Sequence, residues 1–322
     1  MGRVSLISAV GTPLTSDERL HSEGLEAILS AQWASGIDGV LVAGTMGLLQ
    51  LLREETYAQL VEESVPLCRG KGALLIGVGD AGFARTADRI RYTNRFAIDG
   101  VVVVTPYLVR FQRAELADYF LALADVSKAP LYLYDLPSLT GVRLETDLVL
   151  ELSQHPNIAG IKCSGSLDDA LDLIQRADPT FRVIVAQADR VDALCRQGIH
   201  HHLDGVFSLV PEWTNNIARA AENEDWAAAA AAQRLVSETL KVLHQYGVFP
   251  AYSALMGARG ISGSFAPKPF RTLDEARCSE LLDSPLVESL KLASLGLKRS
   301  DPAHAVAEPN GEVTKTKRVL SS

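Results

Sequence analysis

The fold of this chain is decided by two short apolar stretches, LYLYDLP at residues 131–137 and IAGIKC at residues 158–163. Each has the length of a β-strand, and alternation along the first stretch places Tyr132 and Tyr134 on one face. Lys162 lies near the end of the second stretch, where burial would disfavour the charged form of a lysine. Since Tyr134 and Lys162 are separated by about one strand–helix unit, we expect their side chains to meet on adjacent strands.

The same alternation of strand and helix runs through most of the chain. Helical segments carry apolar residues at helical spacing, for example Leu25, Ile28 and Leu29. Strand-like runs lie at residues 5–10, 39–43, 73–78, 100–105, 130–136, 158–163, 182–186 and 205–209. Eight such units over roughly 250 residues predict an α/β fold, a (β/α)8 TIM barrel. An open dinucleotide-binding sheet is disfavoured, because no Gly-x-Gly-x-x-Gly follows the first strand.

The pattern becomes purely helical after residue 209. Helices are expected near residues 226–243, 250–258 and 273–295, so we divide the chain into a barrel at 1–222 and a C-terminal helical extension at 223–296. Residues 297–322 combine Pro, Gly, Ser and mixed charge without periodicity, and this composition predicts a mobile tail.

Composition narrows the classes of partner and the compartment. The formal net charge of -8 argues against a nucleic-acid partner or an anionic membrane. The cysteines lie far apart without a CxxC pair, as expected for reduced thiols in an intracellular protein. The first residues lack the features of a signal peptide, and no window has the length of a membrane span. We therefore expect a cytoplasmic location.

Three places carry candidate chemistry at the C-terminal ends of the predicted strands, where barrel active sites lie. The turn Gly44-Thr45-Met46-Gly47 could hold a carboxylate with backbone N–H groups and the Thr45 hydroxyl. Tyr134 could shuttle a proton, and a neutral Lys162 amine could form a Schiff base with a ketone. Each residue also has a common structural interpretation: turn geometry, a core tyrosine, or a lysine whose stem packs while its head reaches water.

These motifs together resemble the dihydrodipicolinate synthase/N-acetylneuraminate lyase family. The resemblance covers about residues 4–295 and rests on Gly44-Thr45-x-Gly47, Thr105-Pro106-Tyr107, Tyr134-x-x-Pro137-Ser138-x-Thr140-Gly141 and Gly160-Ile161-Lys162. It implies a class I aldolase-type barrel without a metal or cofactor, a small 2-oxo acid substrate such as pyruvate, and a homotetramer built as a dimer of dimers.

The resemblance also implies roles for individual residues. Lys162 would be the Schiff-base lysine and Tyr134 the proton-transfer phenol. Thr45, with the adjacent backbone N–H groups of Gly44, Met46 and Gly47, would bind the substrate carboxylate. The positions of Tyr107, Leu139, Gln187 and Phe207 match residues near the substrate pocket of the family.

Several positions depart from the family pattern. Met46 replaces a second hydroxyl residue and Leu48 replaces an acidic one. Leu108 stands where the synthases have a tyrosine that reaches the neighbouring subunit's proton relay. Leu139 replaces an arginine that holds the carboxylate of the second substrate, which argues against a true dihydrodipicolinate synthase. With Gln187 and Phe207, these changes indicate a pocket for a less charged, partly apolar or sugar-derived 2-oxo acid.

Three functions remain open from the sequence. The leading hypothesis is a lyase that cleaves or joins a 2-oxo acid and an aldehyde through Lys162. A dehydratase acting on a 2-keto-3-deoxy sugar acid would use the same lysine and keep the carbon chain intact. A catalytically silent 2-oxo acid binding protein is the third.

Two further features are interpreted as structural. The run at residues 200–202, three histidines, is expected in a solvated loop before the eighth strand, away from the site and without the spacing of metal ligands. Cys163 should point away from Lys162 and pack against helices.

Overall fold

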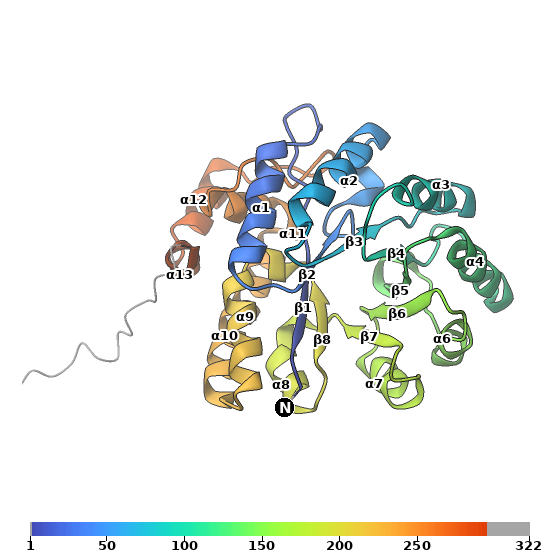
Figure 1. Ribbon diagram of the computed structural model, residues 1–322. Helices are drawn as coiled ribbons and strands as arrows, with labels where there is room; N and C mark the ends of the chain where they lie inside the picture. Colours follow the sequence, from blue (N-terminus) through green and yellow to red (C-terminus); the bar gives the residue numbers. More distant parts are fainter. Residues whose placement is uncertain (1, 295–322) are drawn as a thin grey trace, which may run out of the picture.

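The structure, a computed structural model that describes residues 2–294, is a closed barrel of parallel strands surrounded by helices (Figure 1). In this part of the chain the eight strands follow their sequence order around the barrel. They are β1 Ser5–Ala9, β2 Gly39–Val42, β3 Ala73–Gly77, β4 Gly100–Val104, β5 Leu131–Asp135, β6 Ile158–Cys163, β7 Arg182–Val185 and β8 His201–Asp204. The predicted TIM barrel is therefore confirmed.

Helices connect the strands and continue beyond the last one. Around the barrel lie α1 Ser22–Ala34, α2 Glu54–Cys68, α3 Phe83–Thr93, α4 Arg113–Val126, α5 Pro137–Thr140, α6 Thr146–Leu152, α7 Leu167–Arg176, α8 Val191–Arg196 and α9 Pro211–Glu222. Short 3₁₀ turns are η1 Leu49–Leu51, η2 Ala188–Arg190 and η3 Val206–Ser208. The predicted C-terminal helical part consists of α10 Trp226–Tyr246, α11 Val248–Ala258, α12 Glu275–Leu282 and α13 Pro285–Ser294.

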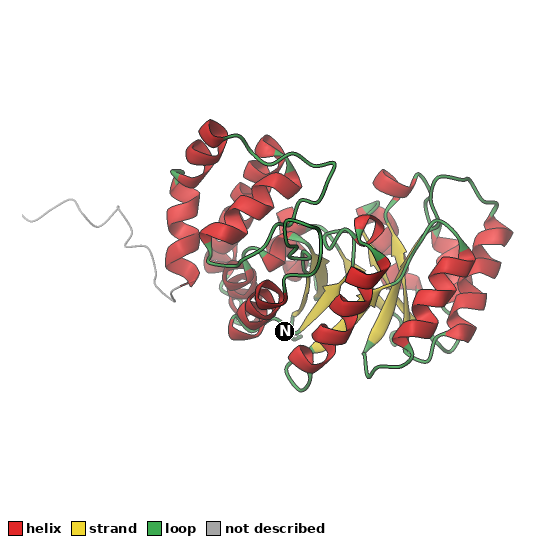
Figure 2. Ribbon diagram, turned by 90° about the horizontal axis from the view of Figure 1, so that it is seen from above, coloured by secondary structure: helices red, strands yellow, loops and turns green. Residues whose placement is uncertain are grey.

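The C-terminal helices gather on one side of the barrel, as the view from above shows (Figure 2). Helix α10 packs along α9, and α11 packs against α10. The division between barrel and extension at residues 222 and 223 stays a prediction. Residues 295 and 296 of the predicted extension, and the predicted tail at 297–322, lie outside the described residues. Within residues 2–294, no helix combines the length and the apolar character needed to cross a membrane.

The prediction of the eighth strand at residues 205–209 was wrong. Strand β8 is formed by His201–Asp204, which pairs with β1 through Ser5 and Leu6, so two of the three histidines are strand residues and not loop residues. His202 is completely buried, and its Nε2 lies 3.0 Å from the carbonyl oxygen of Ile199. The apolar residues that follow form the turn η3. This turn buries Val206 and Phe207 in the core, so their apolar character does not require a strand.

Alternation along each strand divides the core into two layers. Side chains inside the barrel include Ile7, Leu41, Val102, Ile184 and Leu203, together with Tyr132 and Tyr134. Leu131, Leu133 and Cys163 belong instead to the layer between strands and helices. Cys163 is buried there, which raises the pKa of its thiol, and it faces away from Lys162 as predicted.

A buried ion pair ties the C-terminal helices to the barrel. Arg259, the residue after α11, is bonded by both terminal guanidinium nitrogens to the carboxylate of Glu212 in α9, at 3.1 and 2.5 Å. The Arg259 side chain is only 3% exposed, so its charge depends on this partner. Losing one partner of such a pair leaves a buried charge without compensation.

We expect Glu212→Ala to lower the free energy of unfolding by about 3–5 kcal/mol, because the Arg259 guanidinium would remain buried alone. Urea denaturation measures this loss. The matched control is Glu151→Ala, which removes the half-exposed partner of Arg113 and should cost about 1 kcal/mol or less. Equal losses in the two variants would contradict the assignment of Arg259–Glu212 as the principal tie.

A buried carboxyl group at the end of β5 makes stability depend on pH. Burial is the largest cause that raises the pKa of Asp135, and the charge of Asp169 acts in the same direction. The backbone N–H of Leu144 donates to this carboxylate at 2.9 Å and acts in the opposite direction. Folding raises the pKa of Asp135 above its ordinary value of 3.8. Its contribution to stability is therefore fully present at a pH below 3.8 and is lost as the pH rises through the pKa of the folded protein.

We therefore expect Asp135→Asn to raise the midpoint of thermal unfolding near pH 8, because the amide keeps an acceptor for Leu144 without a buried charge. The gain should shrink toward about pH 4, where the native carboxyl group is increasingly protonated. Thermal unfolding followed by circular dichroism at both pH values checks this. Asp118→Asn, on the exposed face of α4, is the control; a gain for Asp135→Asn that is independent of pH would contradict the explanation.

Candidate active site

A cleft of about 920 Å³ lies at the C-terminal ends of the strands, the end where barrel active sites occur. The loops after β2, β5, β6, β7 and β8 form its floor and one wall, and helices α10 and α11 form the opposite wall. Lys162, Tyr134, Thr45 and Met46 line it together. Residues that the sequence predicted on two strands and in the turn after a third therefore converge on one cavity.

Lys162 and Tyr134 lie side by side at the bottom of this cleft. They are directly paired in the β5–β6 register, and each is 5% exposed. The Lys162 Nζ donates a hydrogen bond to the Tyr134 hydroxyl oxygen at 3.1 Å and lies 4.2 Å from the centre of its ring. The predicted meeting of the two side chains on adjacent strands is confirmed.

A bulge in the strand pair sets this register. Leu131 pairs with Ile158, whereas Tyr132 pairs with Gly160, so the register shifts by one residue between the two pairs. Gly160 is required at this point, because a Cβ there would lie 2.3 Å from the carbonyl oxygen of Arg182. The shift brings Lys162 opposite Tyr134 with both side chains directed into the barrel.

The Tyr134 hydroxyl has a second neighbour in Thr45, whose Oγ1 donates to the phenol oxygen at 3.4 Å. Thr45 and Lys162 both donate to this oxygen. The Tyr134 O–H is therefore free to donate its own proton to a third group. A substrate bound at Lys162 would be such a group. The arrangement is suited to moving a proton to or from an atom next to the lysine nitrogen.

The turn after β2 presents free backbone donors beside these side chains. Its chain reversal is held by Thr12, whose hydroxyl donates to the Gly47 carbonyl at 2.7 Å, and by the Leu48 N–H, which donates to the Thr45 carbonyl at 3.0 Å. The N–H groups of Thr45, Met46 and Gly47 have no acceptor among residues 2–294. Three unpaired donors in one tight turn form a suitable site for a carboxylate.

Sequence reasoning missed Asp204, the last residue of β8, which lines the cleft with Lys162. Its pKa is raised, chiefly because burial penalises the carboxylate, while the charge of Lys162 acts in the opposite direction. The backbone N–H of Val206 donates to it at 3.1 Å. The misplaced eighth strand hid this residue, since a strand at 201–204 would have put a carboxyl group at the catalytic end of the barrel.

Some of the remaining predicted site residues line the cleft, and others, among them the buried Gly44 and Gly47, do not. Leu139 and Gln187 line the cleft, and Leu139 is 69% exposed at its edge. Tyr107 does not line it; burial is the largest cause that raises the pKa of its phenol, and the charge of Asp80 adds to it. Phe207 is completely buried in the outer core and does not line the cleft, because η3 turns it toward the helices. The expected contact of Phe207 with substrate is corrected accordingly.

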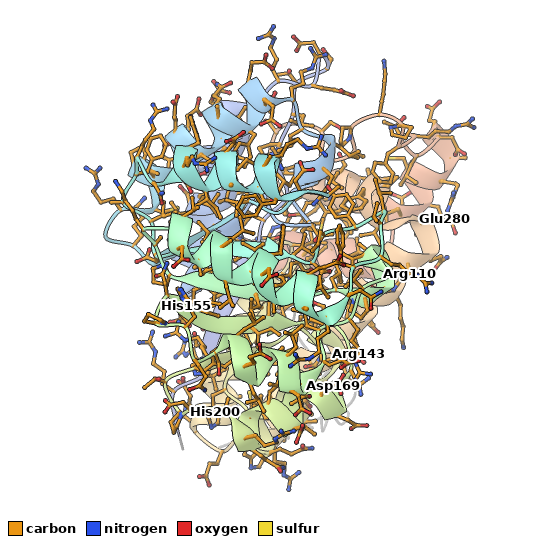
Figure 3. All side chains as sticks on the ribbon, turned by 90° about the vertical axis from the view of Figure 1, so that its right-hand side faces the viewer. Arg110, Arg143, His155, Asp169, His200 and Glu280 are labelled. Carbon is orange, nitrogen blue, oxygen red and sulfur yellow. The ribbon has the colours of Figure 1, made fainter. Side chains whose placement is uncertain are left out.

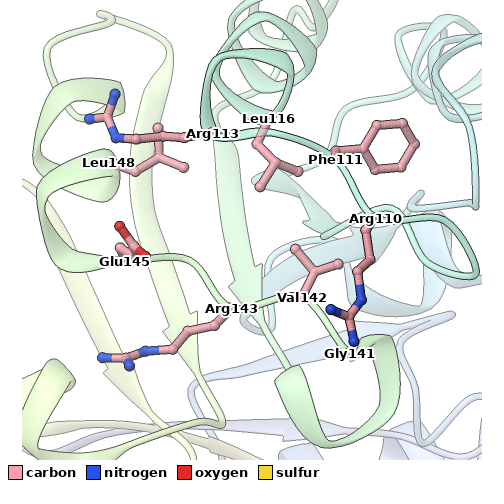
Figure 4. A pocket seen from close by; sticks show the side chains of 9 residues that line it. All are labelled: Arg110, Phe111, Arg113, Leu116, Gly141, Val142, Arg143, Glu145 and Leu148. Carbon is pink, nitrogen blue, oxygen red and sulfur yellow. The ribbon is translucent and has the colours of Figure 1, made fainter.

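A second cavity lies apart from these groups, between the loops that follow β4 and β5 (Figure 4). Three arginines surround it, and two of them form ion pairs, Arg113 with Glu151 and Arg143 with Asp169. Figure 3 shows Arg143 and Asp169 close together on this side of the molecule. The cavity shares no lining residue with the cleft and contains no nucleophile. Among residues 2–294, no three His, Cys, Asp or Glu side chains are placed to hold a metal ion.

Comparison with known proteins agrees with this geometry. The model of the Dihydrodipicolinate synthetase family matches residues 3–284. An N-acetylneuraminate lyase of Rhizobium meliloti (strain 1021) is 29% identical over 288 residues, which are 87% of this chain and 93% of that protein. A 4-hydroxy-tetrahydrodipicolinate synthase of Stenotrophomonas maltophilia (strain K279a) is 31% identical over 210 residues, 65% of this chain and 69% of that one.

Solved structures share the fold. YagE, a prophage protein of the dihydrodipicolinic acid synthase family from E. coli K12, was solved in complex with pyruvate. It is 25% identical to this chain. The superposition has a TM-score of 0.82 and covers 90% of this chain and 99% of YagE. Since the family match spans nearly all of the described residues, this chain belongs to the dihydrodipicolinate synthetase family.

Proposed function

We propose that this protein is a cofactor-independent lyase in which Lys162 forms a Schiff base with pyruvate and thereby cleaves, or forms, a longer 2-oxo acid. Membership of the family supports a Schiff-base, pyruvate-dependent lyase. The observation that carries the residue assignment is the 3.1 Å contact between the Lys162 Nζ and the Tyr134 hydroxyl at the bottom of the cleft.

The first step binds the 2-oxo acid. The free N–H groups of Thr45, Met46 and Gly47, with the Thr45 hydroxyl, hold the carboxylate. The neutral Lys162 amine adds to the ketone carbon, and loss of water gives a protonated imine. Tyr134 lies within hydrogen-bond distance of the nitrogen, so it can give its proton to the departing water and remain as a phenolate.

The second step breaks a carbon–carbon bond. The protonated imine withdraws electrons, so the bond between the carbons beta and gamma to the carboxylate can break. The substrate's gamma hydroxyl loses its proton to Tyr134 and becomes the aldehyde, and the electron pair moves into an enamine on Lys162. Tyr134 returns its proton to the enamine carbon, and hydrolysis of the resulting imine releases pyruvate and restores the lysine.

A true dihydrodipicolinate synthase is disfavoured by Leu139. This alkyl side chain lies at the edge of the cleft. A second substrate that carries a carboxylate would need a cationic side chain there to pair with it. Within residues 2–294 no arginine lines the cleft. The proposed second substrate is therefore an aldehyde without that carboxylate requirement.

A dehydratase acting on a 2-keto-3-deoxy sugar acid is the second candidate, and Asp204 is the observation that favours it. A carboxyl group whose pKa is raised by burial can donate a proton to a leaving hydroxyl group. The products separate the two reactions. Dehydration keeps the carbon chain intact and releases water, whereas aldol cleavage releases pyruvate and an aldehyde.

We also propose a cytoplasmic location and a homotetramer. The four cysteines, all within the described residues, are free thiols, and three of them are buried. This supports a reducing compartment. The tetramer is the assembly that the family resemblance implies, and sedimentation analysis would test it.

Borohydride reduction with pyruvate should leave a pyruvate-sized adduct on Lys162, because hydride fixes an imine but leaves a merely bound keto acid free. Peptide mass analysis locates the adduct. Lys162→Ala should abolish it, whereas Lys241→Ala, which removes another lysine of the same cleft, should retain the adduct on Lys162. Absence of an adduct in the native protein, with undiminished binding of pyruvate by Lys162→Ala, would instead establish a silent 2-oxo acid binding protein.

Tyr134→Phe should lower kcat by about 10²–10⁴-fold, because the ring remains but the proton-transferring hydroxyl is lost. Pyruvate release, followed with a coupled dehydrogenase, measures the rate. Tyr132→Phe is the matched control, since Tyr132 lies on the same strand face but does not line the cleft. Similar rates for Tyr134→Phe and the native enzyme would remove Tyr134 from the mechanism.

A further inference from the structure

The cleft is larger than its reacting groups require. Its volume of about 920 Å³ is near the upper end of small-molecule sites, whereas the proposed pyruvate portion would need only the space between the turn after β2 and Lys162. The remaining space extends outward between the loop after β5 and helices α10 and α11. This outer part is where the rest of a longer 2-oxo acid, the portion released as an aldehyde, would lie.

The outer part is lined mainly by apolar side chains. They are Leu136 after β5, Leu139 from α5, Leu240 and Leu243 from α10, and Val248 and Phe249 from α11. The Phe249 ring lies 4.9 Å, centre to centre, from the ring of Phe270, so the aromatic wall is itself supported. Hydroxyl groups placed against these six residues would lose their water without gaining a partner.

Three polar side chains of this part are engaged with the protein itself. Asp189 is paired with Arg190 at 2.7 Å, and the Gln187 amide donates to the Gly165 carbonyl at 3.4 Å. The Ser237 hydroxyl donates to the backbone carbonyl of Asp189 at 3.4 Å. Lys241 and His244 also line the cleft but are exposed at its outer end. A polyhydroxylated chain would find free side-chain partners in this part only at the exposed Ser138, Lys241 and His244, and a carboxylate would meet no bidentate cation.

We propose that the aldehyde partner of this enzyme is apolar, with an aryl or alkyl group that packs between Leu139 and the wall formed by Leu240 and Phe249. This rests on the proposed Schiff-base function. In the synthetic direction, the enamine carbon of Lys162-bound pyruvate attacks the aldehyde carbon and Tyr134 protonates the resulting oxygen. Hydrolysis then releases the 4-hydroxy-2-oxo acid, so one pyruvate and one aldehyde give one product without a further reactant.

The test compares aldehydes that share the reacting group. The native enzyme is supplied with pyruvate and benzaldehyde, hexanal, glyceraldehyde or succinic semialdehyde, and the 4-hydroxy-2-oxo acid is quantified by mass spectrometry. The expected kcat/KM for benzaldehyde or hexanal exceeds that for the other two by about 10-fold or more. Preference for glyceraldehyde or succinic semialdehyde would overturn the inference.

Two variants locate the preference in the outer wall. Leu240→Asn should reduce the ratio of kcat/KM for benzaldehyde to that for glyceraldehyde by about 10-fold, because it places an unpaired amide against the aryl group. Leu139→Arg should raise activity with succinic semialdehyde, because it supplies the missing carboxylate partner. The matched control, Ile174→Asn, changes an exposed apolar residue of α7 outside the cleft and should leave the ratios unchanged. Unchanged ratios in both cleft variants would contradict the assignment.

Different results would overturn the apolar aldehyde site and the Schiff-base function. A borohydride-trapped adduct on Lys162, combined with a preference for polar aldehydes, overturns the apolar pocket and leaves the Schiff-base function standing. Absence of any adduct from the folded native enzyme, checked by its circular dichroism spectrum, overturns the Schiff-base function itself and the aldehyde assignment with it.

Discussion

The register between β5 and β6 is the constraint on which the rest of the site depends. Because strand side chains alternate, a slip of one residue would turn Lys162 into the layer of helices and bring Cys163 into the barrel. The bulge between the Leu131 and Tyr132 pairs prevents this, and Gly160 next to it allows the close approach of β7 on the other side of β6. Closure of the barrel then brings the turn after β2 and the end of β8 to the same place.

Polarity changes sharply along the cleft. At its inner end lie Lys162 and Tyr134, within hydrogen-bond distance of each other, together with the carboxyl group of Asp204. Farther out, Leu240 and Phe249 offer apolar surface, and Lys241 and His244 lie at the exposed outer end. Such a gradient lets the inner groups act in an environment of low dielectric, where their interactions are stronger than in water, while the outer surface selects the part of the substrate that does not react.

The sequence predicted those parts of the molecule that follow from simple periodicity. Alternation in LYLYDLP and IAGIKC placed Tyr134 and Lys162 on one face, and the repeated strand–helix units indicated the barrel. The eighth strand was misplaced because His201 and His202 look polar, although neutral histidines pack well in a strand; burial is the main cause that lowers the pKa of His202 to about 4. Asp204 and Phe207 were misjudged for the same reason, since each position depended on where that strand ended.

The hydroxyl of Tyr252 in α11 lies 2.7 Å from that of Ser208 in η3 and accepts from the Gly11 N–H at 3.4 Å, so the helix that walls the cleft is anchored to the barrel itself. All reacting groups come from residues before 205, whereas this wall comes from residues 237–252. Apart from Leu136 and Leu139, the wall proposed to select the aldehyde is thus encoded in a later segment of the gene than the proposed reacting groups. New specificities could arise by drift in the later segment alone, with the lysine and its partners left untouched.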